Sequence, residues 1–126
     1  MQNFTQLKVF KKSFRLSKEI FLKTKVSNNY RLKNQLFGAS TSIPANIAEM
    51  GGYKSKKQQA YKIQIAIGES NELTFWIMFC MEVQELNETD CKTYLLEVEE
   101  IRKMLFGLLN SIKIELNSLQ EKHTED

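Results

Sequence analysis

The chain has 126 residues, 42% hydrophobic and 26% charged, which is the size and composition of one globular domain. Its longest charge-free apolar run, residues 73–81, is far shorter than the roughly 20 residues of a membrane-spanning helix, and no apolar signal segment follows Met1. The single histidine, His123, lies in the polar end of the chain, residues 120–126, so we expect no histidine-based acid–base pair, triad or zinc site within one chain. Two cysteines cannot form a disulfide framework, so we expect a reduced, cytoplasmic protein without metal or cofactor.

Charge is unevenly distributed along the chain. Residues 1–63 carry 13 lysines and arginines against two acidic residues, whereas residues 64–126 carry five against 13. This split predicts a basic face and an acidic face on one body, with attraction between halves or between copies and contact with a polyanion. Two solvated helix faces that merely differ in charge are the alternative interpretation.

The first predicted helix runs from Thr5 to about Lys25 and contains no Gly or Pro. Its apolar residues recur at spacings of three and four and cover about 180°, more than the roughly 100° stripe of an ordinary surface helix. We therefore expect a further contact, in addition to packing within the same chain, to cover the apolar side of this helix. The opposite side is the strongest candidate for binding a polyanion, with acidic faces of later helices as the competing partner. Its cations are Lys8, Lys11, Lys12, Arg15 and Lys18.

Residues 26–29 form a polar break suited to a helix N-cap, and a second helix follows. Pro44 inside it removes a backbone donor and crowds the carbonyl of Ser40, which predicts a kink or a restart. Gly51 and Gly52 end this helix, because glycine tolerates a left-handed C-terminal cap. The next helix start is a second candidate anion site, since backbone donors and the helix dipole attract anions there; a solvated cap is the alternative. Its cations are Lys54, Lys56 and Lys57.

Ser55 with Gln58 resembles a capping box and begins a third predicted helix of about 30 residues. Gly68 inside it costs roughly 0.8 to 1 kcal/mol relative to alanine, so another helix backbone is expected to approach closely there, as at Gly38 and Gly107. The second half of this helix is apolar all round, which predicts burial against another protomer. The candidate anchors of that interface are Phe75, Trp76 and Phe79.

Asn87 offers a cap for a fourth predicted helix, whose leucines and isoleucines form one stripe. Four long helices joined by short polar breaks, without any alternation of strand period, predict an all-α protein. The expected architecture is an antiparallel up-and-down four-helix bundle. We expect residues 1–120 to form this single domain and residues 121–126 to form a polar C-terminal tail.

Acidic residues offer one candidate for acid–base chemistry. Asn46 and Glu49 share a helix face, and Glu72 of the third helix is expected near them. A carboxylate pair with a raised pKa performs acid–base work, whereas the structural alternative is a hydrogen-bond network that fixes helix register. With no nucleophile motif nearby, we assign no catalytic residue and predict that the protein is not an enzyme. The expected partners in such a network are Lys33, Arg31 or Gln35.

Several segments resemble one protein family. Residues 4–13 resemble the start of the four-helix-bundle proteins encoded within intervening sequences of bacterial 23S ribosomal RNA genes. Residues 32–39 and 42–49 with Gly52 are similar to the family's central signature, and residues 65–68 with 72–73 are similar to its third-helix signature. The resemblance spans nearly the whole chain. The signature residues to which it gives a structural role are Ser42, Ile43, Pro44, Asn46, Glu49, Gly52, Gly68 and Glu72.

The resemblance implies a rod-shaped bundle that assembles as a ring-like pentamer and has no enzymatic activity. It also implies similarity to accessory proteins of diversity-generating retroelements, which bind nucleic acid and a reverse transcriptase. The chain departs from the family at Phe37, Gly38, Tyr53 and Ile67, and each lost cation weakens contact with phosphates. Met50 also replaces a family glycine. We expect a homo-oligomer that contacts RNA, DNA or a nucleoprotein partner and no membrane. A protein-only scaffold is the alternative.

Overall fold

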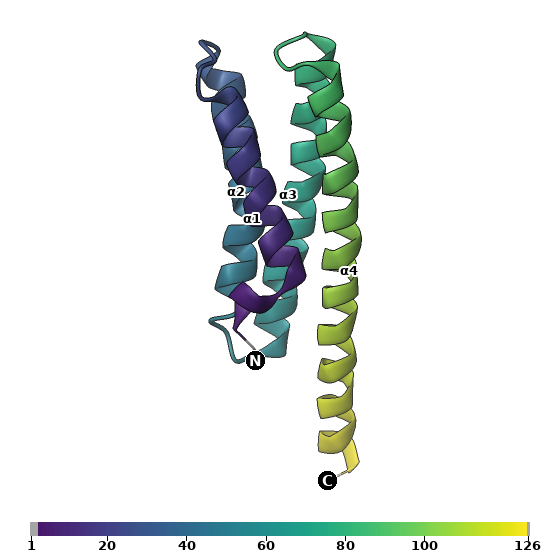
Figure 1. Cartoon of the computed structure of the whole chain (residues 1–126). Coiled ribbons are helices and arrows are strands. Elements are labelled where there is room, and N and C mark those ends of the chain that lie inside the picture. The colour runs from purple at the N-terminus through teal and green to yellow at the C-terminus, as the bar shows by residue number, and fades with distance from the viewer. Residues whose placement is uncertain (1–2, 126) are drawn as a thin grey trace.

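The computed structural model describes residues 3–125, with the side chains of residues 3–122, and it forms a bundle of four long helices (Figure 1). The described residues contain no strand, so the predicted all-α four-helix bundle is confirmed. Figure 1 shows that consecutive helices run in opposite directions. The elements are a short 3-10 helix (Phe4–Gln6), α1 (Lys8–Thr24), α2 (Tyr30–Met50), α3 (Lys56–Glu82) and α4 (Glu88–Glu125).

Three predicted helix starts form as expected. The side chains of Asn29, Ser55 and Asn87 each accept a hydrogen bond from the backbone amide three residues later, at 3.2, 3.3 and 2.8 Å. Each cap satisfies one of the amides that the first turn of a helix leaves without a backbone partner. The short breaks before α2, α3 and α4 are therefore encoded by local chemistry.

The end of α2 differs from the expected left-handed cap. Gly51 has a right-handed φ of −62°, and no glycine of the described chain has a positive φ. A Cβ atom at Gly51 would lie 3.3 Å from the side chain of Phe4 and 3.3 Å from the carbonyl oxygen of Ala48. A side chain at position 51 would therefore be crowded, because Phe4 packs across the end of α2. This contact holds the start of the chain against the connection between α2 and α3.

Helix α2 continues through Pro44, so of the two expected outcomes, a kink or a restart, the restart is wrong. Pro44 is buried in the bundle. Polar side chains around it bind backbone carbonyls of the same helix: the hydroxyl of Ser42 donates to the Gly38 carbonyl at 2.7 Å, and the amide of Asn46 donates to the Ser42 carbonyl at 2.8 Å. These bonds reach the carbonyls of Gly38 and Ser42, and not the carbonyl of Ser40, whose helical donor Pro44 lacks.

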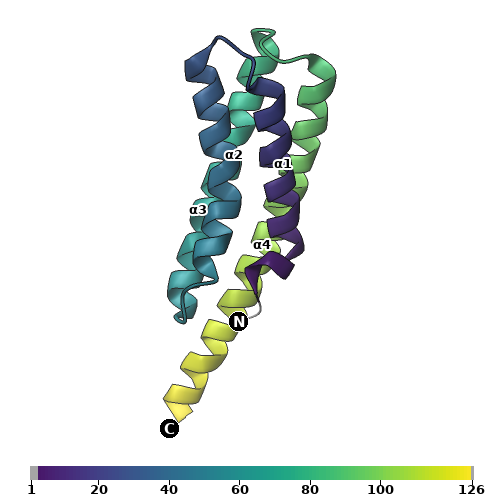
Figure 2. The ribbon, with the colours of Figure 1, turned by 60° about the vertical axis from the view of Figure 1, so that its left-hand side comes forward.

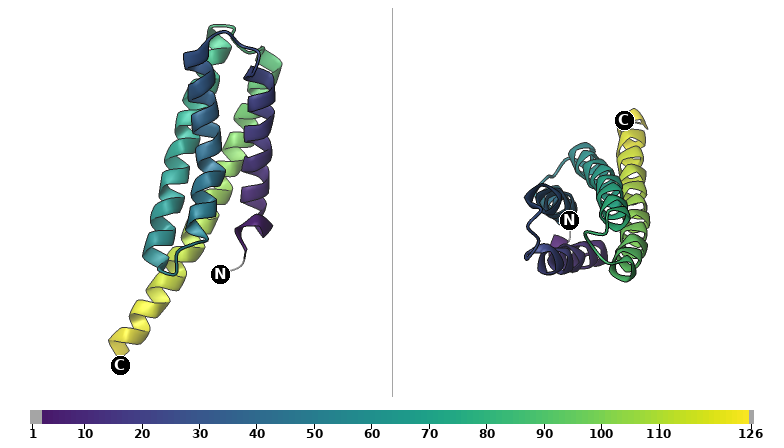
Figure 3. Two further views of the ribbon diagram at one scale, coloured as in Figure 1. Left: turned by 90° about the vertical axis from the view of Figure 1, so that its left-hand side faces the viewer. Right: turned by 90° about the horizontal axis from the view of Figure 1, so that it is seen from above.

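The core is a continuous column of aliphatic side chains between the helices, including fully buried Leu16, Ile43, Ile77 and Ile101. α3 packs extensively against both α2 and α4, whereas α1 and α4 have the smallest contact among the neighbouring helices. Figures 2 and 3 show that the C-terminal part of α4 projects beyond the other helices. The predicted α4 stripe is therefore buried as far as Ile112 and open to solvent at its end.

Within residues 3–125, no helix has the length and apolar character needed to cross a membrane.

Three helical glycines face open space, which contradicts the expected close approach of another helix. A Cβ atom at Gly38, Gly68 or Gly107 would meet no described atom within 4 Å. All three residues are exposed, because each lies on a side of its helix that points away from the core. Nothing in the described part of a single chain explains why glycine stands at these positions.

We predict that Gly68→Ala raises the free energy of unfolding by about 0.5 to 1 kcal/mol. Alanine has less conformational freedom to lose in a helix, and the open space at Gly68 accommodates its methyl group. Urea unfolding followed by circular dichroism measures the change. A loss of stability or of assembly would show instead that another molecule covers Gly68.

Candidate nucleic-acid interface

The outward side of α1 carries four of the five predicted cations, Lys8, Lys11, Arg15 and Lys18, which we call the α1 basic face. All four side chains are exposed. None of them has an ion-pair partner among the described residues. Their positive charges are therefore not neutralised by a direct contact within the described chain.

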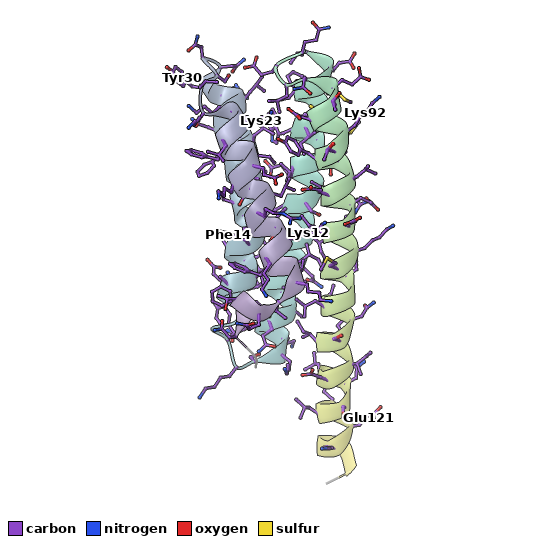
Figure 4. All side chains as sticks on the ribbon, in the orientation of Figure 1. Lys12, Phe14, Lys23, Tyr30, Lys92 and Glu121 are labelled. Atoms are coloured by element: carbon purple, nitrogen blue, oxygen red, sulfur yellow. The ribbon has the colours of Figure 1, made fainter. Side chains whose placement is uncertain are left out.

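Lys12 has a different environment from the α1 basic face. Its ammonium group lies 2.7 Å from the carboxylate of Glu100 on α4, and its side chain is only 21% exposed. Figure 4 shows Lys12 on the side of α1 that faces α4. Hydrogen bonding to Lys12 holds the pKa of Glu100 below its usual value. The five cations predicted on one side of α1 therefore have two different environments. Lys12 pairs with an acidic residue of its own chain, whereas the other four pair with none in the part of the chain that the structure describes.

A second ion pair joins the same two helices near the other end of α1. Lys23, labelled in Figure 4, lies 3.1 Å from the carboxylate of Asp90 on α4. Hydrogen bonds from Lys23 and then Asn87 lower the pKa of Asp90. These two partly exposed ion pairs connect α1 to α4, the neighbouring helices with the smallest contact.

The predicted anion site at the start of α3 is divided in the same way. Lys54 and Lys57 are exposed and have no ion pair among the described residues. Lys56 instead lies 2.5 Å from Glu115 of α4. The contact between Phe4 and Gly51 places this segment at the end of the bundle where α1 begins, as Figure 3 shows. Lys54 and Lys57 therefore extend the positive surface at that end.

The predicted carboxylate group does not come together. Glu49 binds Lys62 of α3 at 2.7 Å, whereas Glu72 accepts a hydrogen bond from the indole of Trp76 at 3.4 Å. Lys62 was missed because the sequence does not fix how α3 is rotated against α2. The expected partner Lys33 donates to the Lys25 carbonyl at 2.9 Å instead. Glu49 and its neighbours thus form a structural contact between α2 and α3, without a carboxylate pair.

The described residues contain no group of three histidine, cysteine, aspartate or glutamate side chains that could hold a metal ion. Cys80 and Cys91 are both buried thiols without a disulfide. Burial raises the pKa of Cys80 to about 11, with a smaller effect from Cys91. The Cys80 thiol is therefore protonated at neutral pH, which makes it a poor nucleophile.

Glu97 of α4 is a partly buried acidic group close to α1. Its Oε2 atom is buried and has no hydrogen-bond partner among the described atoms. Burial raises the pKa of Glu97, and the negative charge of Glu19 on α1 raises it further. The charged form of Glu97 therefore destabilises the folded chain at neutral pH.

We predict that Glu97→Gln raises the melting temperature at pH 7, because it removes a charge that is partly buried beside Glu19. The folded-state pKa lies above the unfolded value, so wild-type stability rises as pH falls through the folded-state pKa. The advantage of Glu97→Gln should be largest above that pKa and should vanish below the unfolded value of about 4.3. Thermal unfolding across this range measures it, and a gain that is independent of pH would contradict the explanation.

Comparison with known proteins places the chain in a family. Residues 5–107 match the model of the family described as 23S rRNA-intervening sequence protein. No curated protein matches the chain. A crystal structure of a protein of unknown function from the S23 ribosomal protein family of Bacteroides thetaiotaomicron has a TM-score of 0.74 and 24% identity, covering 81% of this chain and 95% of that chain. At this identity the likeness shows the shared fold alone. The family match covers most of the sequence, and the chain belongs to the 23S rRNA-intervening sequence protein family.

Proposed function

We propose that the protein is a non-catalytic homo-oligomer that binds RNA or DNA, free or within a nucleoprotein, through the α1 basic face together with Lys54 and Lys57. The observation that carries the proposal is the difference between these exposed cations and Lys12 and Lys56, which bind acids of the same chain. Cations without internal partners can neutralise phosphates and release the counterions that surround nucleic acid.

The proposed binding is directed at the sugar–phosphate backbone. Lysine and arginine side chains on one exposed helix contact phosphates, whereas sequence is read by base contacts in the grooves. No RNA-binding sequence module is recognisable in the chain. Assembly strengthens such contacts, because several copies present the same basic face and weak contacts add through avidity. The pentamer is the assembly that the family resemblance implies.

A titration with fluorescently labelled RNA and DNA of the same sequence tests the proposal, at about 50 mM and about 200 mM salt. We expect binding at the lower salt that weakens steeply at the higher salt. Lys12→Ala is the matched control, because it removes a cation whose charge already binds Glu100, and it should retain wild-type affinity. Absence of binding to both nucleic acids at about 50 mM salt would overturn the proposal.

The second candidate function is a protein-only scaffold whose basic face binds acidic surfaces. The ion pairs of Lys12 with Glu100 and Lys56 with Glu115 favour it, because cations of the basic half already contact acids of the acidic half. A scaffold would assemble to more than the monomer mass in light scattering and would not bind either nucleic acid. Those two measurements together distinguish it from the nucleic-acid-binding oligomer.

A further inference from the structure

An apolar groove lies on the outside of the bundle between α1 and α2. It has a volume of about 280 Å³, and its walls include Phe14 and Phe21 of α1 and Phe37 of α2. These three side chains are 58%, 43% and 43% exposed. Figure 4 shows Phe14 on the side of the bundle away from α4. We call this surface the α1–α2 groove; Lys18 lies at its rim.

The groove explains the unusually broad apolar arc of α1. The core side of α1 is formed by residues such as Leu16 and Ile20, which are fully buried within the chain. Phe14 and Phe21 stand outside this core side and remain exposed, although the ring of Phe21 lies 5.5 Å from that of Phe37. Clustered exposed aromatic rings of this kind mark a surface for binding another molecule.

A second exposed aromatic surface lies on α3. Phe75 and Phe79 are 55% and 42% exposed, and the ring of Trp76 lies 4.9 Å from Phe75 and 6.2 Å from Phe79. Glu72 accepts the Trp76 indole hydrogen bond beside this cluster, and Glu82 is exposed farther along α3. The α3 cluster, Phe75, Trp76 and Phe79, therefore combines aromatic rings with neighbouring negative charge.

We propose that the α3 cluster of one copy of the chain docks into the α1–α2 groove of the next copy. Both surfaces carry exposed aromatic rings, and the cation at the groove, Lys18, complements Glu72 beside the cluster. In the assembly Lys18 therefore belongs to the contact between copies, and Lys8, Lys11 and Arg15 remain for phosphates. The same complementarity is present in the whole chain, whose first half is basic and second half acidic. This inference rests on the proposed homo-oligomer, and it names the surfaces that join the copies.

Docking of one face onto a different face has a structural consequence. Each copy uses its groove for one neighbour and its α3 cluster for the other, so the contact is heterologous and repeats from copy to copy. Such contacts close into a ring when the rotation between copies permits it. A contact of the groove with another groove would instead stop at a dimer.

Two variants, each of which lacks one of the two docking surfaces, test this docking. Phe21→Lys disables the groove and leaves the α3 cluster intact, whereas Phe75→Lys disables the cluster and leaves the groove intact. We expect each variant alone to be monomeric in light scattering at micromolar concentration. An equimolar mixture should form a species of about twice the 14.7 kDa monomer mass and stop there, because only one functional groove and one functional cluster can meet.

Leu96→Lys is the matched control, because Leu96 is a 71% exposed apolar residue on α4, outside both surfaces; this variant should assemble like the wild type. Circular dichroism verifies that each variant folds, and Phe21→Ser and Phe75→Ser replace any lysine variant that does not. A folded mixture that stays monomeric while the wild type assembles overturns the docking, as does wild-type assembly by either variant alone. A monomeric wild type refutes the homo-oligomer itself, and nucleic-acid binding is read separately in the titration.

Discussion

Reversing two charges of the α1 basic face, Lys11→Glu with Arg15→Glu, should lower the affinity for RNA or DNA by at least about 100-fold at about 50 mM salt. Each substitution removes a cation available to a phosphate and adds a repelling negative charge, since neither residue has an ion-pair partner in the described chain. Assembly would multiply the loss, because every copy carries the change. Fluorescence anisotropy with labelled RNA and DNA measures it.

The control for this prediction changes net charge by the same amount at a distant place. Lys113 and Lys122 are exposed on the later part of α4, and Lys113→Glu with Lys122→Glu should reduce affinity much less. If both double variants lose affinity equally, overall charge governs binding and the assignment to the α1 basic face is wrong. Circular dichroism must show that both variants retain the helical content of the wild type.

Leu105→Ala should lower the free energy of unfolding by about 3 kcal/mol. Leu105 of α4 is fully buried in the core, and truncation of such a leucine removes apolar contacts and leaves a cavity. Leu96→Ala on the same helix is the matched control, because Leu96 is 71% exposed and should change stability by less than about 0.5 kcal/mol. Urea unfolding at one fixed protein concentration compares them. Similar losses of stability for both substitutions would contradict the assignment of Leu105 to the core and of Leu96 to the surface.

The helices could be predicted from the sequence because their signals are local. Asn29, Ser55 and Asn87 each cap a helix through an amide three residues away, so a few neighbouring residues determine each boundary. The family resemblance and the periodicity of the apolar residues both predict the four-helix bundle. Gly51 shows the limit of local reasoning, since part of the crowding at this position comes from the distant side chain of Phe4.

The charged surfaces could be predicted only in part, because pairing depends on how each helix is rotated against its neighbours. Lys12 and Arg15 stand on one predicted face, yet Lys12 turns to Glu100 while Arg15 remains exposed. For the same reason the sequence predicts Glu72 close to Glu49, whereas Glu49 pairs with Lys62 in the structure. Periodicity assigns residues to one side of a helix, and only the three-dimensional arrangement decides which of them meet a partner.

The dependence of affinity on salt tests the central claim most directly, that cations of the α1 basic face contact phosphates. Each phosphate contact on duplex DNA contributes about 0.9 to the slope of log K against log salt. We predict a steep negative slope for the wild type, a slope shallower by about 0.9 per engaged copy for Lys11→Ala, and a wild-type slope for Lys12→Ala. A flat wild-type slope, or the same slope for Lys11→Ala as for the wild type, would contradict the claim.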